Sequence, residues 1–153
     1  MAPSAQRYLT HPFTLALAGG MLGLAANQLN LVVASDIALR PGSAFSLLSA
    51  FCLGPWWGAF TALVASSFPL GHVNGPFSIG ATVFEAFAAG WLIHRRHWRP
   101  IPAVAVYWAV IGLPLAYIFA AVRGADQTGS QWISAAESPL NSGLMALCAL
   151  PAA

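Results

Sequence analysis

SAFSLLSAFCLGPWWGAFTALVASSF, residues 43–68, decides the fold, because it is a long apolar stretch without charge and has Gly54-Pro55 near its centre. A helix that crosses the roughly 30 Å hydrocarbon core of a bilayer needs about 20 apolar residues. Read as one tilted helix, this stretch gives the chain five membrane spans. Read as two short helices that break at Gly54-Pro55, it gives six. Proline inside a helix favours the break because it removes a backbone hydrogen bond.

The composition of the whole chain points to a lipid environment. Hydrophobic residues make up 58% of the 153 positions, whereas Asp, Glu, Lys and Arg make up only 7%, against roughly 25% in an ordinary soluble domain. The mean hydropathy is +0.70. So few charged side chains cannot cover the surface of a soluble fold of this length. We therefore expect an all-α fold, a polytopic transmembrane helix bundle whose partner is the lipid bilayer.

Polar loops divide the rest of the chain into further apolar segments. We expect one domain over residues 1–153, with a polar loop between the first two segments that contains Asn30, Ser35, Asp36, Arg40 and Pro41. The expected membrane-spanning helices cover, approximately, residues 12–29, 43–53, 56–68, 77–94, 102–122 and 132–150.

The arginines decide between the two topologies. Arg7 precedes the first apolar segment, and three arginines within residues 95–99 follow the segment 77–94. Positive residues concentrate on the cytoplasmic side of membrane proteins, and only six helices place Arg7 and the 95–99 cluster on the same side. We therefore prefer six helices in a bacterial inner membrane, with both termini cytoplasmic. Gly54 and Pro55 then form a structural turn on the cytoplasmic side.

Glu85 is the most informative single residue. It lies near the middle of the segment 77–94, with no basic residue within one helical turn. A carboxylate at that depth costs at least a few kcal/mol unless it is paired, hydrated or protonated. We therefore expect Glu85 to face the bundle interior, either as a ligand or proton site or as a hydrogen-bonded packing residue.

Other polar residues are candidate ligand-binding partners of Glu85. Each alone is more typical of hydrogen bonding between helices than of a ligand site, but together they converge on the outer half of the membrane. Tyr107 and Trp108 open the next helix on the cytoplasmic side, so we do not expect them in an outward-facing site. The candidates are Glu85, Asn141, Glu137, Asn27, Asn30, His72 and Asn74.

No catalytic motif is present, and we expect neither an enzyme nor a cofactor. Cys52 and Cys148 both lie inside apolar runs without a partner at metal-ligand spacing. His94 and His97 sit within the arginine cluster, whose positive field opposes a metal, so we expect no metal site. The arginines are not spread along one face, which argues against nucleic acid as a partner.

Small residues on the first segment permit close helix packing. Gly19 and Gly23 form a small-xxx-small pair. This pair indicates packing within the bundle or, alternatively, a homodimer formed through that face.

Several fragments together resemble a family of membrane sensors. They are Asn27-Gln28-Leu29-Asn30, Leu53-Gly54-Pro55-Trp56-Trp57-Gly58, Glu85 followed by Gly90-Trp91 and Arg95-Arg96, Tyr107-Trp108 leading to Ile111-Gly112-Leu113-Pro114, and Asn141. This arrangement resembles the N-terminal multi-spanning sensor region of bacterial signalling proteins, the LytS-type five-helix and MASE1-like regions of histidine kinases and diguanylate cyclases. The resemblance implies a signal-input module that couples a small ligand or membrane state to a cytoplasmic output.

A second resemblance competes with the first. Six helices, a Gly-Pro hairpin between the second and third, and a polar outer pocket are similar to the substrate-binding S component of energy-coupling-factor vitamin transporters. The sensor interpretation requires a cytoplasmic signalling domain or partner protein, and the chain reaches Ala153 directly after the last apolar segment. We therefore expect the output kinase or cyclase in a longer chain or in a separate partner.

Overall fold

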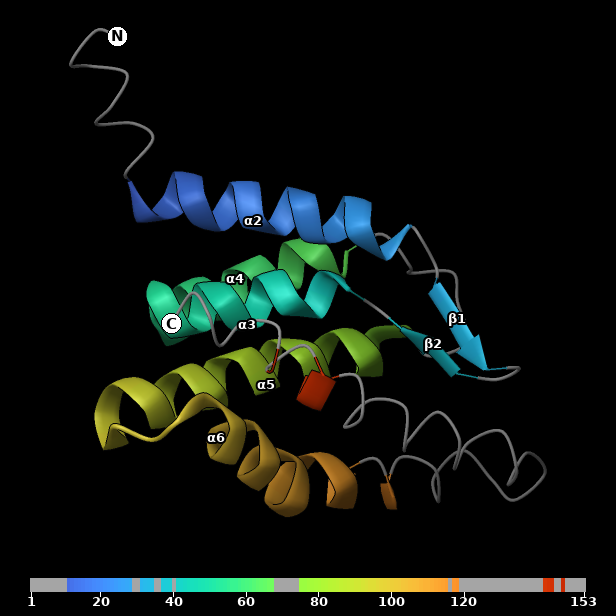
Figure 1. The fold of residues 1–153 in the computed structure, drawn as a ribbon, viewed down its shortest axis with the longest axis vertical. Coiled ribbons are helices and arrows are strands. Elements are labelled where there is room, and N and C mark those ends of the chain that lie inside the picture. Colours follow the sequence, from blue (N-terminus) through green and yellow to red (C-terminus); the bar gives the residue numbers. More distant parts are fainter. Residues whose placement is uncertain are drawn as a thin grey trace, which may run out of the picture.

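A computed structural model describes residues 11–28, 31–34, 37–39, 41–67, 75–115, 117–118, 142–144 and 147. Within these residues the fold is helical, as expected, and successive long helices run back and forth beside one another (Figure 1). The helices are α2 (Pro12–Asn27), α3 (Gly42–Cys52), α4 (Pro55–Ala65), α5 (Gly75–Arg96), α6 (Pro100–Tyr107) and the π-helix η1 (Trp108–Gly112).

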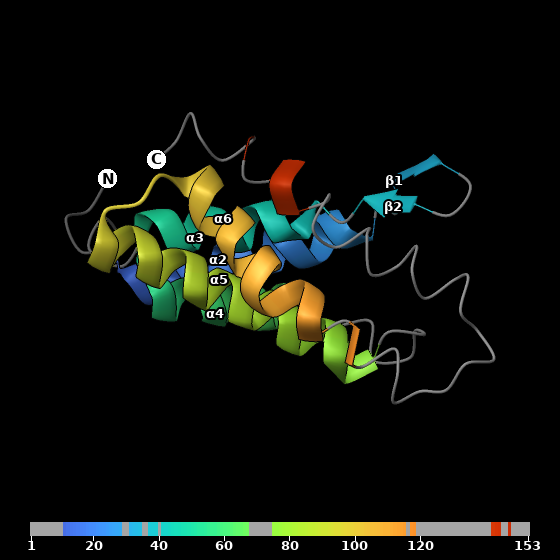
Figure 2. The same ribbon diagram turned by 90° about the horizontal axis from the view of Figure 1, so that it is seen from below.

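A small β-hairpin lies between the first two helices, where only a short polar loop was expected. Strands β1 (Leu31–Ala34) and β2 (Ile37–Leu39) pair antiparallel, with Leu31 opposite Leu39. The segment is rich in Val, Ile and Leu, and β-branched residues favour extended backbone. The hairpin projects from the end of the bundle opposite the turn between α5 and α6 (Figure 2).

The stretch 43–68 contains two helices rather than one. Helix α3 ends at Cys52 and α4 begins at Pro55, where proline suits the first turn of a helix. Gly54 has a φ of 107°, a conformation that favours glycine. Each helix has 11 residues, about 16 Å at 1.5 Å per residue, so neither alone matches the bilayer core.

Small residues bring α2, α3 and α4 close together. A Cβ atom on Gly20 would lie 2.7 Å from Val64 Cβ, and one on Gly23 would lie 2.9 Å from Ala65 Cβ. Gly58 has no room for a side chain because the backbone of Ala50 lies against it. The Gly19 and Gly23 face therefore packs on α3 and α4 of the same chain. We call α2, α3 and α4 the three-helix unit.

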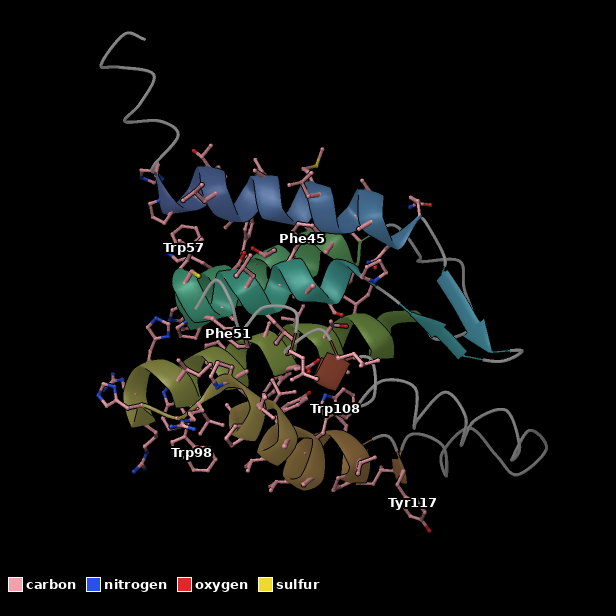
Figure 3. All side chains as sticks on the ribbon, viewed as in Figure 1. Phe45, Phe51, Trp57, Trp98, Trp108 and Tyr117 are labelled. Atoms are coloured by element: carbon pink, nitrogen blue, oxygen red, sulfur yellow. The ribbon has the colours of Figure 1, made fainter. Side chains whose placement is uncertain are left out.

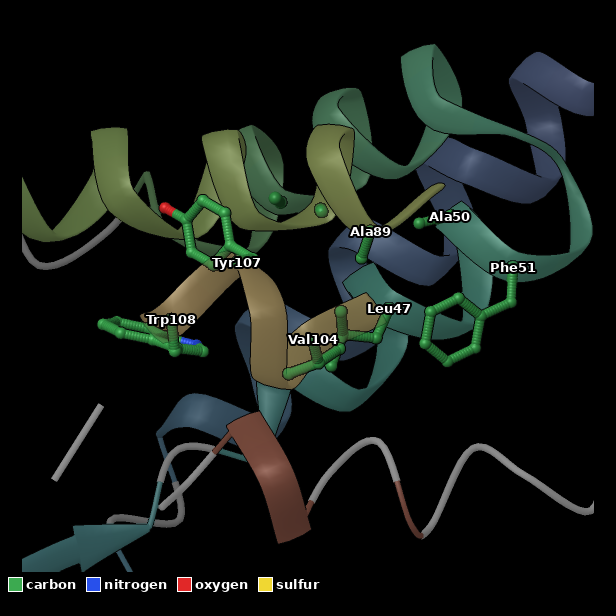
Figure 4. Packing of buried hydrophobic residues seen from close by; sticks show 9 residues of the cluster. Leu47, Ala50, Phe51, Ala89, Val104, Tyr107 and Trp108 are labelled. Carbon is green, nitrogen blue, oxygen red and sulfur yellow. The ribbon is translucent and has the colours of Figure 1, made fainter. Parts of the chain in front are cut away.

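The larger core residues lie where α3 meets α5 and α6. Leu47 and Phe51 of α3 belong to the same buried cluster as Val104, Tyr107 and Trp108 (Figure 4). Most other members of the buried core are alanines: Ala16, Ala50, Ala62, Ala65, Ala86, Ala89 and Ala103. No helix within the described residues combines the length and apolar character that a crossing of the membrane requires.

Candidate buried carboxyl site

Glu85 lies inside the bundle and joins three segments that are far apart in the sequence. Its side chain is only 2% exposed. The indole Nε1 of Trp108 donates a hydrogen bond of 2.8 Å to Oε1, and the hydroxyl of Ser142 donates one of 2.9 Å to Oε2. Glu85 belongs to α5, Trp108 begins η1, and Ser142 lies in the helical turn 142–144. We call these three residues the carboxyl site.

The backbone around Trp108 has an unusual form that positions the indole. The N–H of Leu113 donates to the carbonyl of Trp108, five residues earlier, which is the hydrogen bond of a π-helix. Gly112 lies directly against the indole ring, because a Cβ there would overlap the six-membered ring of Trp108. The π-helix and a residue without a side chain therefore let the indole lie against its own helix while its N–H reaches Glu85.

Tyr107 makes a second polar link between the same two helices. Its hydroxyl donates a hydrogen bond of 2.9 Å to the carbonyl of Ala81, one turn before Glu85 on α5. The rings of Tyr107 and Trp108 meet edge to face with their centroids 5.5 Å apart, a geometry that aromatic pairs favour. Neighbouring aromatic residues thus fix the position of α6 and η1 on α5.

The surroundings of Glu85 are neutral. Both carboxyl oxygens have a hydrogen-bond donor, and neither donor carries a charge. No buried side-chain nitrogen or oxygen in the described part of the protein lacks a partner. The site therefore satisfies the hydrogen bonds of Glu85 without compensating a charge, and an ionised carboxylate here carries a large desolvation cost.

The expectation that Trp108 lies away from the site is wrong, and the helix geometry gives the reason. Trp108 lies eight residues after Pro100, about 12 Å along the helix, and Glu85 lies eleven residues before Arg96, about 16 Å. The two residues are therefore at similar depth from the same end of the bundle. Counting along both helices from their shared turn would have found the pair.

Asn27 is structural and does not join Glu85. Its amide Nδ2 donates to the carbonyl of Ala65 at 3.1 Å, and its Oδ1 accepts from the N–H of Gly42 at 2.9 Å. It thus links the end of α2 to the start of α3 and the end of α4. Its partners are separate from those of Glu85, so these two candidates belong to different places in the bundle.

The remaining predicted partners lie outside the described residues. These are Asn30, His72, Asn74, Glu137 and Asn141. Ser142, which the sequence argument missed, directly follows Asn141 and supplies the contact to Glu85. The polar character of the last segment near residue 141 was the signal, but serine is too common in membrane helices to be chosen on its own.

The carboxyl site combines one buried carboxyl group with two neutral hydrogen-bond donors. Glu85 can accept hydrogen bonds or bind a proton, and its described partners are the indole N–H of Trp108 and the hydroxyl of Ser142. Among the described residues no group of three His, Cys, Asp or Glu side chains could hold a metal ion. The arrangement can therefore bind a proton or a hydrogen-bond donor, or hold helices together.

In the part of the chain that the structure describes, the fold and site define a helical bundle with a buried acid, Glu85, at the junction of three segments. Comparison of the chain with protein families, with curated proteins and with solved structures finds no match. The functional argument therefore rests on the physical features of the bundle.

Proposed function

We propose that this protein is an integral membrane signal-input module, with the carboxyl site as its switching element. The observation that carries the membrane part is the distribution of side chains by size. Small residues fill much of the interior, whereas large apolar side chains face outward. Trp56 is 74% exposed and Val110 is 65% exposed. Extensive exposed apolar surface marks regions that meet a membrane or a partner, and small interior residues are typical of helix packing in lipid.

The positions of charge support the same proposal. Residues 41–84 and 100–122 contain no Asp, Glu, Lys or Arg. Within the described residues the acidic side chain, Glu85, points inward, and the arginines lie at the turn between α5 and α6. The outer faces of the helices are therefore free of charge along their length, as the hydrocarbon core requires.

The signalling part rests on the way Glu85 connects the bundle. One side chain holds η1 and the 142–144 turn against α5. A ligand, a proton or a membrane state that competes for Glu85 would release both at once. Such a stimulus changes the equilibrium between two arrangements only if it favours one of them. The helix movement would then pass to a cytoplasmic output domain or partner protein.

Membrane location is tested by extraction and by topology reporters. We expect the full chain to sediment with membranes through carbonate washing and to need detergent for release. A reporter fused after Arg99 is expected to report the cytoplasm, and one at His72 the outside. Release by carbonate alone contradicts membrane integration, and an outside location of Arg99 contradicts the six-helix topology.

The switching role is tested by hydrogen exchange in nanodiscs. We expect Glu85→Leu to increase amide exchange in α6, η1 and residues 142–144, while Glu85→Gln, which still accepts a hydrogen bond, leaves it near the wild-type level. Equal amide exchange in the wild type, Glu85→Leu and Glu85→Gln would show that Glu85 has no switching role and only packs the helices. Mass spectrometry of the purified protein completes the test, because a tightly retained vitamin would favour the transport-subunit alternative over the sensor.

A further inference from the structure

The turn between α5 and α6 carries the strongest charge in the described part of the protein. Residues 94–99, which we call the basic turn, contain His94, Arg95, Arg96, His97 and Arg99. All five side chains are exposed. No acidic residue occurs between residues 86 and 125, and Glu85 is held by Trp108 and Ser142 in the interior. The arginines therefore have no counter-ion among the described residues.

The backbone concentrates these charges at one place. His97 has a φ of 54°, and its N–H donates to the carbonyl of Ile93 at 3.0 Å, which ends α5 with a left-handed residue. Arg99 follows in extended backbone and caps α6. Arg95 and Arg96 thus end one helix and Arg99 precedes the next, on either side of Trp98, which Figure 3 labels at the end of the bundle.

Exposed tryptophans lie at the same end. Trp98 is part of the basic turn, and Trp91 lies on the last turns of α5; both are exposed. Trp56 packs edge to face on Phe87 of α5 at 5.0 Å. A Cβ on Gly90 would lie only 2.8 Å from the Cα of Pro55, so the α3–α4 turn lies against α5 here. Tryptophan favours the headgroup level of a bilayer, which places the basic turn there too.

We propose that the basic turn binds the phosphate of an anionic phospholipid headgroup. Guanidinium groups bind phosphate oxygens through paired hydrogen bonds, and three of them in one turn can surround a single phosphate. The exposed tryptophans beside them suit the glycerol and upper acyl region of the same lipid. The inference rests on the proposed membrane location and adds a specific lipid site to it.

The test uses the full chain in neutral detergent and native mass spectrometry with added lipid. Dioleoyl phosphatidylglycerol is the probe, and dioleoyl phosphatidylcholine, which also has a phosphate but no net charge, is its matched lipid. We expect phosphatidylglycerol to bind more tightly. Each arginine near an anionic headgroup contributes roughly a fivefold change in affinity. The triple variant Arg95→Gln/Arg96→Gln/Arg99→Gln should therefore bind phosphatidylglycerol roughly a hundredfold more weakly.

Two further variants keep the result interpretable. Arg40→Gln/Arg123→Gln makes the same chemical change outside the basic turn and should retain the wild-type affinity for phosphatidylglycerol. If the triple variant fails to fold, Arg99→Gln alone should still weaken binding roughly fivefold. Equal affinities for the two lipids, or equal losses from the Arg40/Arg123 and Arg95/Arg96/Arg99 variants, would overturn the proposal.

Competition experiments with soluble phosphate compounds distinguish a lipid site from a site for free phosphate. Inorganic phosphate and glycerol 3-phosphate should not compete with phosphatidylglycerol at equal concentration, and competition there would overturn the lipid assignment. The carbonate wash distinguishes failure of the lipid site from failure of the proposed membrane location. A chain that stays in the membrane but binds both lipids equally refutes only the lipid site, whereas release by carbonate refutes the membrane location itself.

Discussion

The three-helix unit and the carboxyl site hold helices together by different means. In the three-helix unit, glycine and alanine allow close backbone approach, and Thr61 donates to the carbonyl of Ala16 across two helices. At the carboxyl site, large aromatic residues pack around one acid whose partners are side chains. Backbone packing cannot be changed by a ligand without separating the helices. Side-chain hydrogen bonds to a carboxyl group can be exchanged, which is why we propose the carboxyl site as the adjustable part.

The largest expected effect comes from filling the three-helix unit. Gly58→Leu would force a side chain into the backbone of Ala50 and should lower the free energy of unfolding by about 3 kcal/mol or more, since overpacking a tight interface forces the backbone to move. Unfolding in mixed micelles with increasing dodecyl sulfate measures it.

Gly80→Ala provides the matched control for that substitution. Nothing lies within 4 Å of a Cβ at Gly80, so the added methyl group should be neutral or stabilise α5 by up to about 1 kcal/mol through helix propensity. Similar losses in both variants would mean that the close approach at Gly58 is not what holds α3 and α4 together.

The next prediction distinguishes the hydrogen bonds of Glu85 from the space that its side chain fills. Glu85→Leu leaves the indole N–H of Trp108 buried without an acceptor and should cost about 1–3 kcal/mol, the penalty for an unsatisfied buried donor. Glu85→Gln keeps an acceptor and should cost less than half as much. A Leu variant as stable as the Gln variant would show that the hydrogen bonds at this site contribute no stability.

A smaller effect compares the two neighbouring aromatic residues. Trp108→Phe removes the donor to Glu85 and should cost about 1–2 kcal/mol, a value at the upper end for a hydrogen bond because Glu85 loses one of its two partners. Tyr107→Phe removes only the bond to the Ala81 carbonyl and should cost about 0.5–1 kcal/mol. In hydrogen-exchange measurements, only Trp108→Phe should loosen the 142–144 turn, because that turn shares Glu85 with it.

The smallest effect tests the polar contact in the three-helix unit. Thr61 is fully buried, and Thr61→Val keeps its shape while removing the hydroxyl that bonds the Ala16 carbonyl. Hydrogen bonds between membrane helices average about 0.6 kcal/mol, so the variant should be only slightly less stable. A loss above 2 kcal/mol would show that this hydroxyl, and not the glycines, dominates the packing of α2 on α4.

Sequence reasoning predicted the helical fold and the interior position of Glu85, because both follow from the cost of polar groups in lipid. It also offered a break at Gly54-Pro55, where the structure ends α3 and begins α4. It missed the β-hairpin because two short strands of aliphatic residues give little signal beside polar neighbours. It misplaced Trp108 because the depth of a residue depends on where its helix begins, and α6 begins at the same turn where α5 ends.

The π-helix has a consequence for the helical residues 113–115 that directly follow it. An α-helix turns by about 100° per residue, and a π turn closes its hydrogen bond one residue later. Residues 113–115 are therefore offset by about one residue, or 100°, from the faces that an unbroken α-helix would give them. If the hydrogen bond between Trp108 and Glu85 breaks and η1 changes from a π-helix to an α-helix, Leu113 and Leu115 rotate around the helix axis. Loss of one hydrogen bond to Glu85 would thus rotate the helical residues that directly follow η1.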